Sequence, residues 1–205
     1  MGLALRILSA WTPRRVLLRE LAVLDGRTTR ALDGLVARHA PGSVASLAPH
    51  APAASGSLED RRDAMAAAHE ARIVALAAAV GRERAVNLAR ETLFRVGLEV
   101  GEEARARLGV GGTVEDLVRA ARVLYRVLGI EFHVEGHGPG GWVMRVDRCA
   151  LARRYSDATC LALSAADEGV IRGLDPRASM AFEERLAAGA PACVARIHMG
   201  EGAGP

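Results

Sequence analysis

The spacing of hydrophobic residues changes at Gly129, and this change constrains the fold more than any other feature of the chain. Upstream of it, hydrophobic residues recur at every third or fourth position, which is typical of helices that bury one face. Downstream of it, hydrophobic and polar residues alternate over 130–135 and again over 142–147, which is typical of half-buried strands. A glycine-rich run at 138–141 separates the two alternating segments, so the sequence predicts a β-hairpin there.

Start and stop signals divide the rest of the chain into helices and a second hairpin. Residues 57–60 (Ser-Leu-Glu-Asp) have the pattern of a capping box, while Gly81 and the glycines near 109–112 mark the ends of two long helices. Thr113 begins a further helix that leads into the first hairpin. We expect one more helix at 156–174 and a second hairpin with strands at 179–186 and 193–199. The predicted fold class is α+β, with N-terminal helices followed by a helix-hairpin-helix-hairpin core and a mainly antiparallel sheet, in which the hairpins can pair edge to edge.

The chain divides by composition into four parts. Residues 1–40 form an N-terminal helical segment, in which Thr12-Pro13 has the pattern of a helix start, Asp25-Gly26 that of a stop, and 28–38 fits a second short helix. Residues 41–57 are rich in Pro, Ala, Ser and Gly and predict a flexible linker. We expect 58–199 to be the α+β ligand-binding or hydrolase-like domain and 200–205 to be a disordered tail.

Composition and charge exclude several classes of partner. All 27 basic residues are Arg, yet the net charge is only +3, and the arginines are interleaved with acids as on a solvated helix surface. Aromatic residues make up only 3% of the chain, so stacking platforms for nucleic acid are scarce. No apolar run approaches the roughly 18 residues of a membrane-spanning helix. We therefore expect a small-molecule ligand rather than nucleic acid or a membrane, and the edge strands allow a homodimer.

The three cysteines of the chain allow two interpretations, one structural and one chemical. Cys149, Cys160 and Cys193 are separated by 11 and 33 residues, which is not the spacing of a zinc knuckle. Each can be a small buried hydrophobic residue, or a thiolate that acts as nucleophile or metal ligand. Because an odd number of cysteines cannot pair fully and no secretory signal is recognised, we expect a reducing, cytoplasmic compartment.

Charged residues on the predicted strands also have alternative roles. His133 and Glu135 share one face of a strand with His137, the geometry of an acid/base pair or a facial metal site, but this face is solvated if the Phe132 face is buried. At the second hairpin, Glu183, Glu184 and Arg185 are consecutive. One acid can face the site and Arg185 can hold a carboxylate, or all three can form a surface charge cluster.

A family resemblance rests on the segments around the cysteines. Arg148-Cys149 after a strand, Cys160 in the next helix, and residues 182–193 (FEERLAAGAPAC) resemble the L-2-amino-thiazoline-4-carboxylic acid hydrolase family. The same segments are similar to the wider group of 4-vinyl-reductase-type ligand-binding domains. The resemblance covers about 64–199. It implies opening of a small thiazoline ring by water, which gives a carbamoyl cysteine.

The residue patterns and the resemblance together give candidate roles to residues of this chain. For a hydrolase, the candidate catalytic residues are Cys160, Cys193, His133 and Glu184, and the candidate substrate-binding residues are Arg185, Cys149 and Glu135. For a non-catalytic sensor, the resemblance implies zinc held by Cys160 and Cys193, with Glu183, or alternatively Glu184, as the acidic ligand. Arg185 stands where that zinc site would have a further cysteine, so the cofactor is expected to be none or zinc, and catalysis itself stays open.

Overall fold

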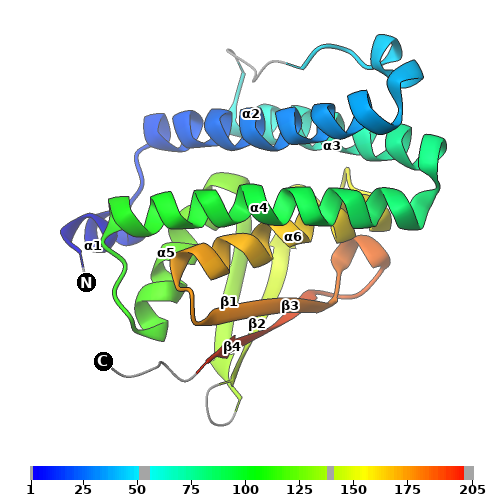
Figure 1. The fold of residues 1–205 in the computed structure, drawn as a ribbon. Helices are drawn as coiled ribbons and strands as arrows, with labels where there is room; N and C mark the ends of the chain where they lie inside the picture. The colour runs from blue at the N-terminus through cyan, green and yellow to red at the C-terminus, as the bar shows by residue number, and fades with distance from the viewer. Residues whose placement is uncertain (1, 51–55, 138–140, 201–205) are drawn as a thin grey trace.

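The computed structural model describes residues 2–50, 56–137 and 141–200, and it confirms the α+β class and the order of the core elements. In Figure 1 the chain runs from the N-terminal helices to the C-terminal hairpin. The elements are α1 (Leu3–Ala10), α2 (Arg14–His39), η1 (Pro41–Ser46), α3 (Leu58–Val80), α4 (Arg82–Leu108), α5 (Val114–Leu128), β1 (Ile130–Gly136), β2 (Gly141–Cys149), α6 (Asp157–Leu174), β3 (Ala178–Glu184), η2 (Leu186–Ala188) and β4 (Cys193–Met199).

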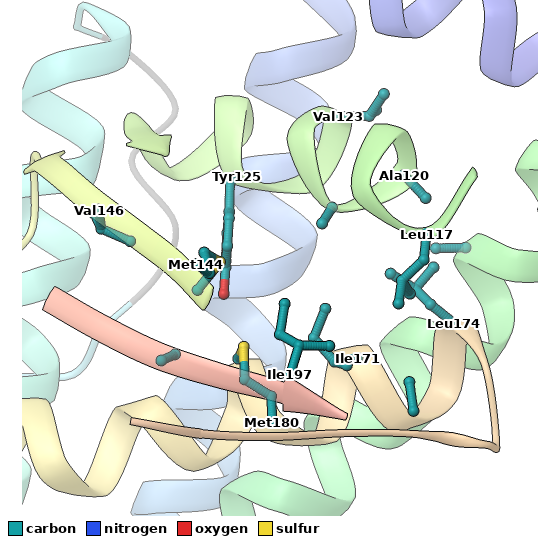
Figure 2. Close-up of a cluster of buried hydrophobic side chains, with 14 of the residues drawn as sticks. Leu117, Ala120, Val123, Tyr125, Met144, Val146, Ile171, Leu174, Met180 and Ile197 are labelled. Atoms are coloured by element: carbon teal, nitrogen blue, oxygen red, sulfur yellow. The ribbon is translucent and has the colours of Figure 1, made fainter. Parts of the chain in front are cut away.

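The two hairpins form one four-stranded antiparallel sheet. Its strand order is β1-β2-β4-β3, so the hairpins pair edge to edge, a possibility that the sequence left open, and they do so through β2 and β4. Met144 lies opposite Val134 on one side and Ala195 on the other, and Ala195 lies opposite Phe182. This row faces the helices, and Figure 2 shows Met144 beside Tyr125 of α5 and Ile197 beside Ile171 of α6. The turn predicted at 138–141 lies mostly outside the described residues.

The helices stack in layers on one face of the sheet. α5 and α6 contact the strands, α4 packs along α6, and α2 and α3 pack together against α4, on the side away from the sheet (Figure 1). α2 therefore packs against α3 and α4. Among the described residues, no helix is long and apolar enough to cross a membrane.

α4 and α6 approach each other backbone to backbone. A Cβ atom added at Gly97 would lie 2.0 Å from the carbonyl oxygen of Ala166, and one at Gly169 would lie 2.1 Å from that of Phe94. Gly101 and Gly173 make similar approaches one turn further along. Only residues without a Cβ permit this contact, so the four glycines form a seam that fixes α6 against α4.

Several helix ends follow the predicted signals. The Ser57 hydroxyl accepts a hydrogen bond from Asp60 N at 3.1 Å, and the Asp60 carboxylate accepts from Ser57 N at 2.8 Å, which completes the capping box. Thr113 caps α5 by accepting from Asp116 N at 3.2 Å. Both interactions satisfy amide groups that a helix start leaves without partners.

Two predictions about the N-terminal segment were wrong. α2 continues through Asp25-Gly26 as one helix, because Asp25 is buried and bound by Thr29 and His50 instead of ending the helix. Thr12 does not cap α2, since its hydroxyl donates to Leu8 O at 2.9 Å. Of the predicted linker, 41–46 forms η1 and 51–55 lies outside the described residues. Of the predicted tail, 201–205 also lies outside them.

Candidate functional site

A cavity of about 120 Å³ lies between the α2/α3 layer and the sheet, with α4 and α6 at its sides. One buried water needs roughly 10–15 Å³ on the same measure, so this space suits a small organic ligand. Apolar side chains make up nearly all of its wall. The few polar residues that line it, apart from the three cysteines, are Thr28, His69, Tyr125, Tyr155, Ser164, Asp167 and Arg185.

One face of α6 provides the central wall of the cavity. Cys160, Ser164 and Asp167 line it at positions i, i+4 and i+7. This spacing places three side chains on the same side of a helix. The glycine seam fixes α6 against α4, so backbone packing sets the position of these three groups.

Asp167 is the one carboxylic acid that lines the cavity among the described residues. It is partly buried, and burial raises its pKa from 3.8 to about 7. A hydrogen bond with the Tyr125 side chain lowers this pKa, and the charge of Glu168 raises it. A carboxyl group with such a pKa can both accept and donate a proton near neutral pH. Asp167 therefore has the properties of a general acid or base.

Tyr125 is held firmly next to Asp167. It is only 4% exposed, and its ring meets Phe132 edge to face at a centroid distance of 5.2 Å. Burial, followed by the charge of Asp167, raises the pKa of Tyr125 well above its ordinary value of 10.0. Figure 2 shows the ring reaching from α5 toward Met144. The phenol therefore stays protonated and serves as a fixed hydrogen-bonding partner of Asp167.

Arg185 brings a positive charge to the same cavity. Its Nη2 donates to Ser164 Oγ at 3.3 Å, and its guanidinium lies 5.6 Å from the ring centroid of Phe182. Its Nε is buried without a hydrogen-bond partner, and no described carboxylate forms an ion pair with Arg185. A guanidinium in this state is suited to bind an anionic ligand group.

The three cysteines line this cavity as protonated thiols. All are free, and burial raises the pKa of Cys149 from 9.0 to about 11 and that of Cys160 to about 12. The pKa of Cys193 is also raised by burial, although the Leu186 amide and the Arg185 charge lower it. Since the thiolate is the nucleophile, thiols in this environment are weakly reactive at pH 7.

The structure places the remaining predicted site residues outside the cavity. His133 and Glu135 lie on the open face of the sheet, where His133 Nδ1 is 3.1 Å from Asp147 Oδ2, because Phe132 and Val134 turn toward the core. Glu183 is on the same open face and pairs with Arg196 at 2.6 Å. Glu184 is exposed beyond a bulge in β3. These four side chains do not meet Cys160, Cys193 or Arg185 at the cavity.

The donor atoms do not fit the zinc ion that the sensory resemblance implies. Cys160 and Cys193 border the cavity, but Glu183, the acid predicted to join them, points to the other face of the sheet. Within the described parts of the chain, no group of three His, Cys, Asp or Glu residues is close enough to hold a metal. A zinc site needs three or four converging donors.

Sequence reasoning missed a buried hydrogen-bonded histidine at the far end of the cavity. His69 Nε2 lies 2.8 Å from Thr28 Oγ1, and His69 Nδ1 lies 2.8 Å from the Tyr155 hydroxyl. Burial, with the charges of His50 and Arg72, lowers the pKa of His69 to about 3, so the ring is neutral. Asp167 was missed as well, although its helical spacing from Cys160 is a signal that the sequence contains.

Comparisons with known proteins agree with the family resemblance. The family model described as L-2-amino-thiazoline-4-carboxylic acid hydrolase matches residues 61–197. A comparison with curated proteins gives no match.

Two solved structures are similar in fold. A trafficking protein particle complex subunit 3 from Naegleria fowleri, covalently bound to palmitic acid, has a TM-score of 0.57 at 14% identity and covers 70% of this chain and 97% of that one. The phenol-responsive sensory domain of the transcription activator PoxR with phenol has a TM-score of 0.51 at 16% identity, with coverages of 65% and 74%. At these identities the likeness shows the fold alone.

Proposed function

The chain belongs to the L-2-amino-thiazoline-4-carboxylic acid hydrolase family, and we propose on this basis that it hydrolyses a small cyclic C–N compound that carries a carboxylate. The cavity beside α6 is the proposed active site. One observation supports this assignment most: Arg185, without an ion-pair partner among the described residues, and Asp167, a carboxylic acid with a pKa near 7, line the same apolar cavity.

The positions of Arg185 and Asp167 suit a substrate with a carboxylate at one end. Arg185 is bonded to Ser164, which lies three residues before Asp167 on the same helix face, or about 4.5 Å along the axis. A carboxylate held by the guanidinium fork would therefore leave the attached ring within reach of Asp167. Apolar walls exclude bulk water and strengthen both electrostatic interactions.

In the proposed reaction, ionised Asp167 takes a proton from a water molecule whose oxygen bonds to the ring carbon between nitrogen and sulfur. The electron pair of the C=N bond moves to the ring nitrogen, to which Asp167 passes the proton that it took from water. When the tetrahedral intermediate collapses to a carbonyl, Asp167 accepts the hydroxyl proton, the C–S bond breaks and sulfur leaves with the bonding pair. Asp167 then passes this second proton to sulfur. One water is consumed, and its hydrogens end on nitrogen and sulfur of a carbamoyl cysteine.

The test is turnover of 2-amino-thiazoline-4-carboxylate by the purified chain, followed through release of the new thiol. Asp167→Asn should lower kcat by about 10²- to 10⁴-fold, the usual contribution of a general base. Arg185→Gln should raise KM by about tenfold or more, because it removes a charge-assisted hydrogen bond. Glu183→Gln is the matched control on the open face of the sheet. Full activity in Asp167→Asn would refute the assignment.

A second candidate function is a non-catalytic small-molecule sensor. The nearly apolar wall and the protonated thiols favour it, because both suit a ligand that is bound and left unchanged. Such a protein should be stabilised by small ring compounds in a thermal unfolding assay and should not convert them. Turnover in the wild-type chain that is lost in Asp167→Asn would exclude this alternative.

A further inference from the structure

A series of three hydrogen-bonded side chains leads from the N-terminal helices to the cavity. Thr28 lies on α2, outside the segment 61–197 that matches the family, His69 lies on α3, and Tyr155 lies in the loop before α6. Thr28 Oγ1 and the Tyr155 hydroxyl each lie 2.8 Å from one ring nitrogen of His69. All three residues line the cavity.

The backbone of α2 determines the direction of these hydrogen bonds. Thr28 Oγ1 lies 2.8 Å from Leu24 O and 3.3 Å from Asp25 O, and carbonyl oxygens can only accept. The single hydroxyl proton of Thr28 is therefore directed at the backbone, and its oxygen must accept from His69 Nε2–H. Because the neutral ring carries one proton, Nδ1 has none and accepts from the Tyr155 hydroxyl.

We propose that this series fixes the Tyr155 oxygen as a hydrogen-bond acceptor toward the cavity, so that the site selects ligands with an N–H or O–H donor on an apolar ring. The Tyr155 hydroxyl donates its proton to His69 Nδ1, so only the lone pairs of its oxygen are left for a ligand. A ligand without a donor would leave that oxygen unpaired in apolar surroundings. The inference rests on the proposed function in one respect, that the cavity is the ligand site, and it does not require catalysis.

Tyr155 and Arg185 together would also orient the ligand. Tyr155 reaches His69 in the α2/α3 layer, whereas Arg185 contacts Ser164 on α6 and Phe182 on β3. Figure 1 shows the sheet and the α2/α3 layer on opposite sides of α4 and α6. The acceptor and the cation therefore approach the cavity from different layers. A ring compound with an amino group at one end and a carboxylate at the other matches both.

The experiment compares aniline with toluene, which have similar shapes and differ in the N–H donors. Calorimetry gives the dissociation constants for the wild-type chain, Tyr155→Phe, Thr28→Val and Thr29→Val. For each protein we take the ratio of the two dissociation constants. Comparing this ratio between proteins cancels the difference in hydration of the two probes. We expect the preference for aniline to fall about three- to tenfold in Tyr155→Phe, as for loss of one hydrogen bond.

Thr28→Val and Thr29→Val are a matched pair that separates this role from general stability. Both replace a buried hydroxyl on α2, but the Thr29 hydroxyl donates to Asp25 Oδ1 at 3.1 Å and does not contact His69. Thr28→Val removes the acceptor for His69 Nε2–H, so the ring proton should move to Nδ1 and the Tyr155 proton should become free. The preference for aniline should fall in Thr28→Val and stay at the wild-type value in Thr29→Val.

Nitrogen chemical shifts of His69, measured by NMR on the full chain at pH 7, report which ring nitrogen carries the proton. Protonation at Nε2 in the wild type and at Nδ1 in Thr28→Val supports the proposal. A proton on Nδ1 in the wild type, an unchanged probe ratio in Tyr155→Phe, or no binding of either probe to the wild type overturns it. Loss of thiazoline turnover alone would defeat the proposed hydrolase function and leave these results unaffected.

Discussion

Replacement of Gly169 by Ala is the most direct test of how the cavity wall is held in place. The new Cβ would lie 2.1 Å from Phe94 O and 2.8 Å from Leu98 N, where ordinary contacts begin at about 3.4 Å. Both obstructing atoms belong to the backbone of α4, so no rotamer change can relieve the contact. α4 and α6 must therefore move apart by about 1.3 Å at this point, which disturbs packing along the whole seam.

The expected cost follows from two opposing effects. Overpacking of a close contact costs about 1–3 kcal/mol, and a clash with backbone belongs at the upper end of that range. Replacing Gly by Ala within a helix recovers about 1 kcal/mol of helix propensity. The net loss should be about 2 kcal/mol in the free energy of unfolding, or roughly 4–8 °C in Tm for a chain of this size.

Urea and thermal unfolding measure this change, and Gly34→Ala is the control. Gly34 is also inside a helix, but a Cβ there would meet nothing within 4 Å, so this variant should equal or exceed the wild type in stability. If Gly169→Ala were as stable as Gly34→Ala, the description of the seam as a backbone contact would be wrong.

Three further predictions concern the charges and thiols of the cavity. Because the pKa of Asp167 rises from 3.8 to about 7 on folding, wild-type stability should fall as pH rises through this window. Asp167→Asn should remove that loss and be more stable at pH 8 by about 4 kcal/mol, as measured by urea unfolding. An unchanged pH profile would contradict the burial of a carboxyl group. If Asp167 acts as general base, kcat/KM should rise with pH through about 7 and level off above it; a profile that is flat from pH 5 to 8 would argue against this role. The raised pKa values of Cys149 and Cys160 predict slow modification by a thiol-specific reagent at pH 7.4 in the native chain and fast modification in urea, whereas rapid native labelling of all three cysteines would contradict it.

The sequence alone predicted those parts of the fold that depend on local patterns. The alternation around Phe132 and Met144 and the capping box at Ser57 are short-range signals, and each formed the element expected. The helix end predicted at Asp25-Gly26 was wrong because a stop signal is only a propensity. Contacts of Asp25 with Thr29 and His50 outweighed it.

Candidate site residues were harder to predict, because a site depends on which side chains are brought together from distant elements. The cysteines and Arg185 lie at the cavity, yet His133, Glu135, Glu183 and Glu184 lie away from it. For His133 the outcome depended on which face of the sheet was covered, and the sequence left both alternatives open. Asp167 belongs to no motif in the sequence, and its properties depend on the packing of α5, which places Tyr125 beside it.

The glycine seam has a consequence for how relatives with this architecture can diversify. A substitution at Gly97 or Gly169 forces two backbones apart, and no single compensating change elsewhere restores the contact. Cavity-lining positions such as Cys160 and Ser164 carry no such constraint, since their side chains do not lie between the two helix backbones. Natural selection can therefore reach new ligand preferences by exchanging side chains along α6 in single steps, while the helix that presents them stays in the same place.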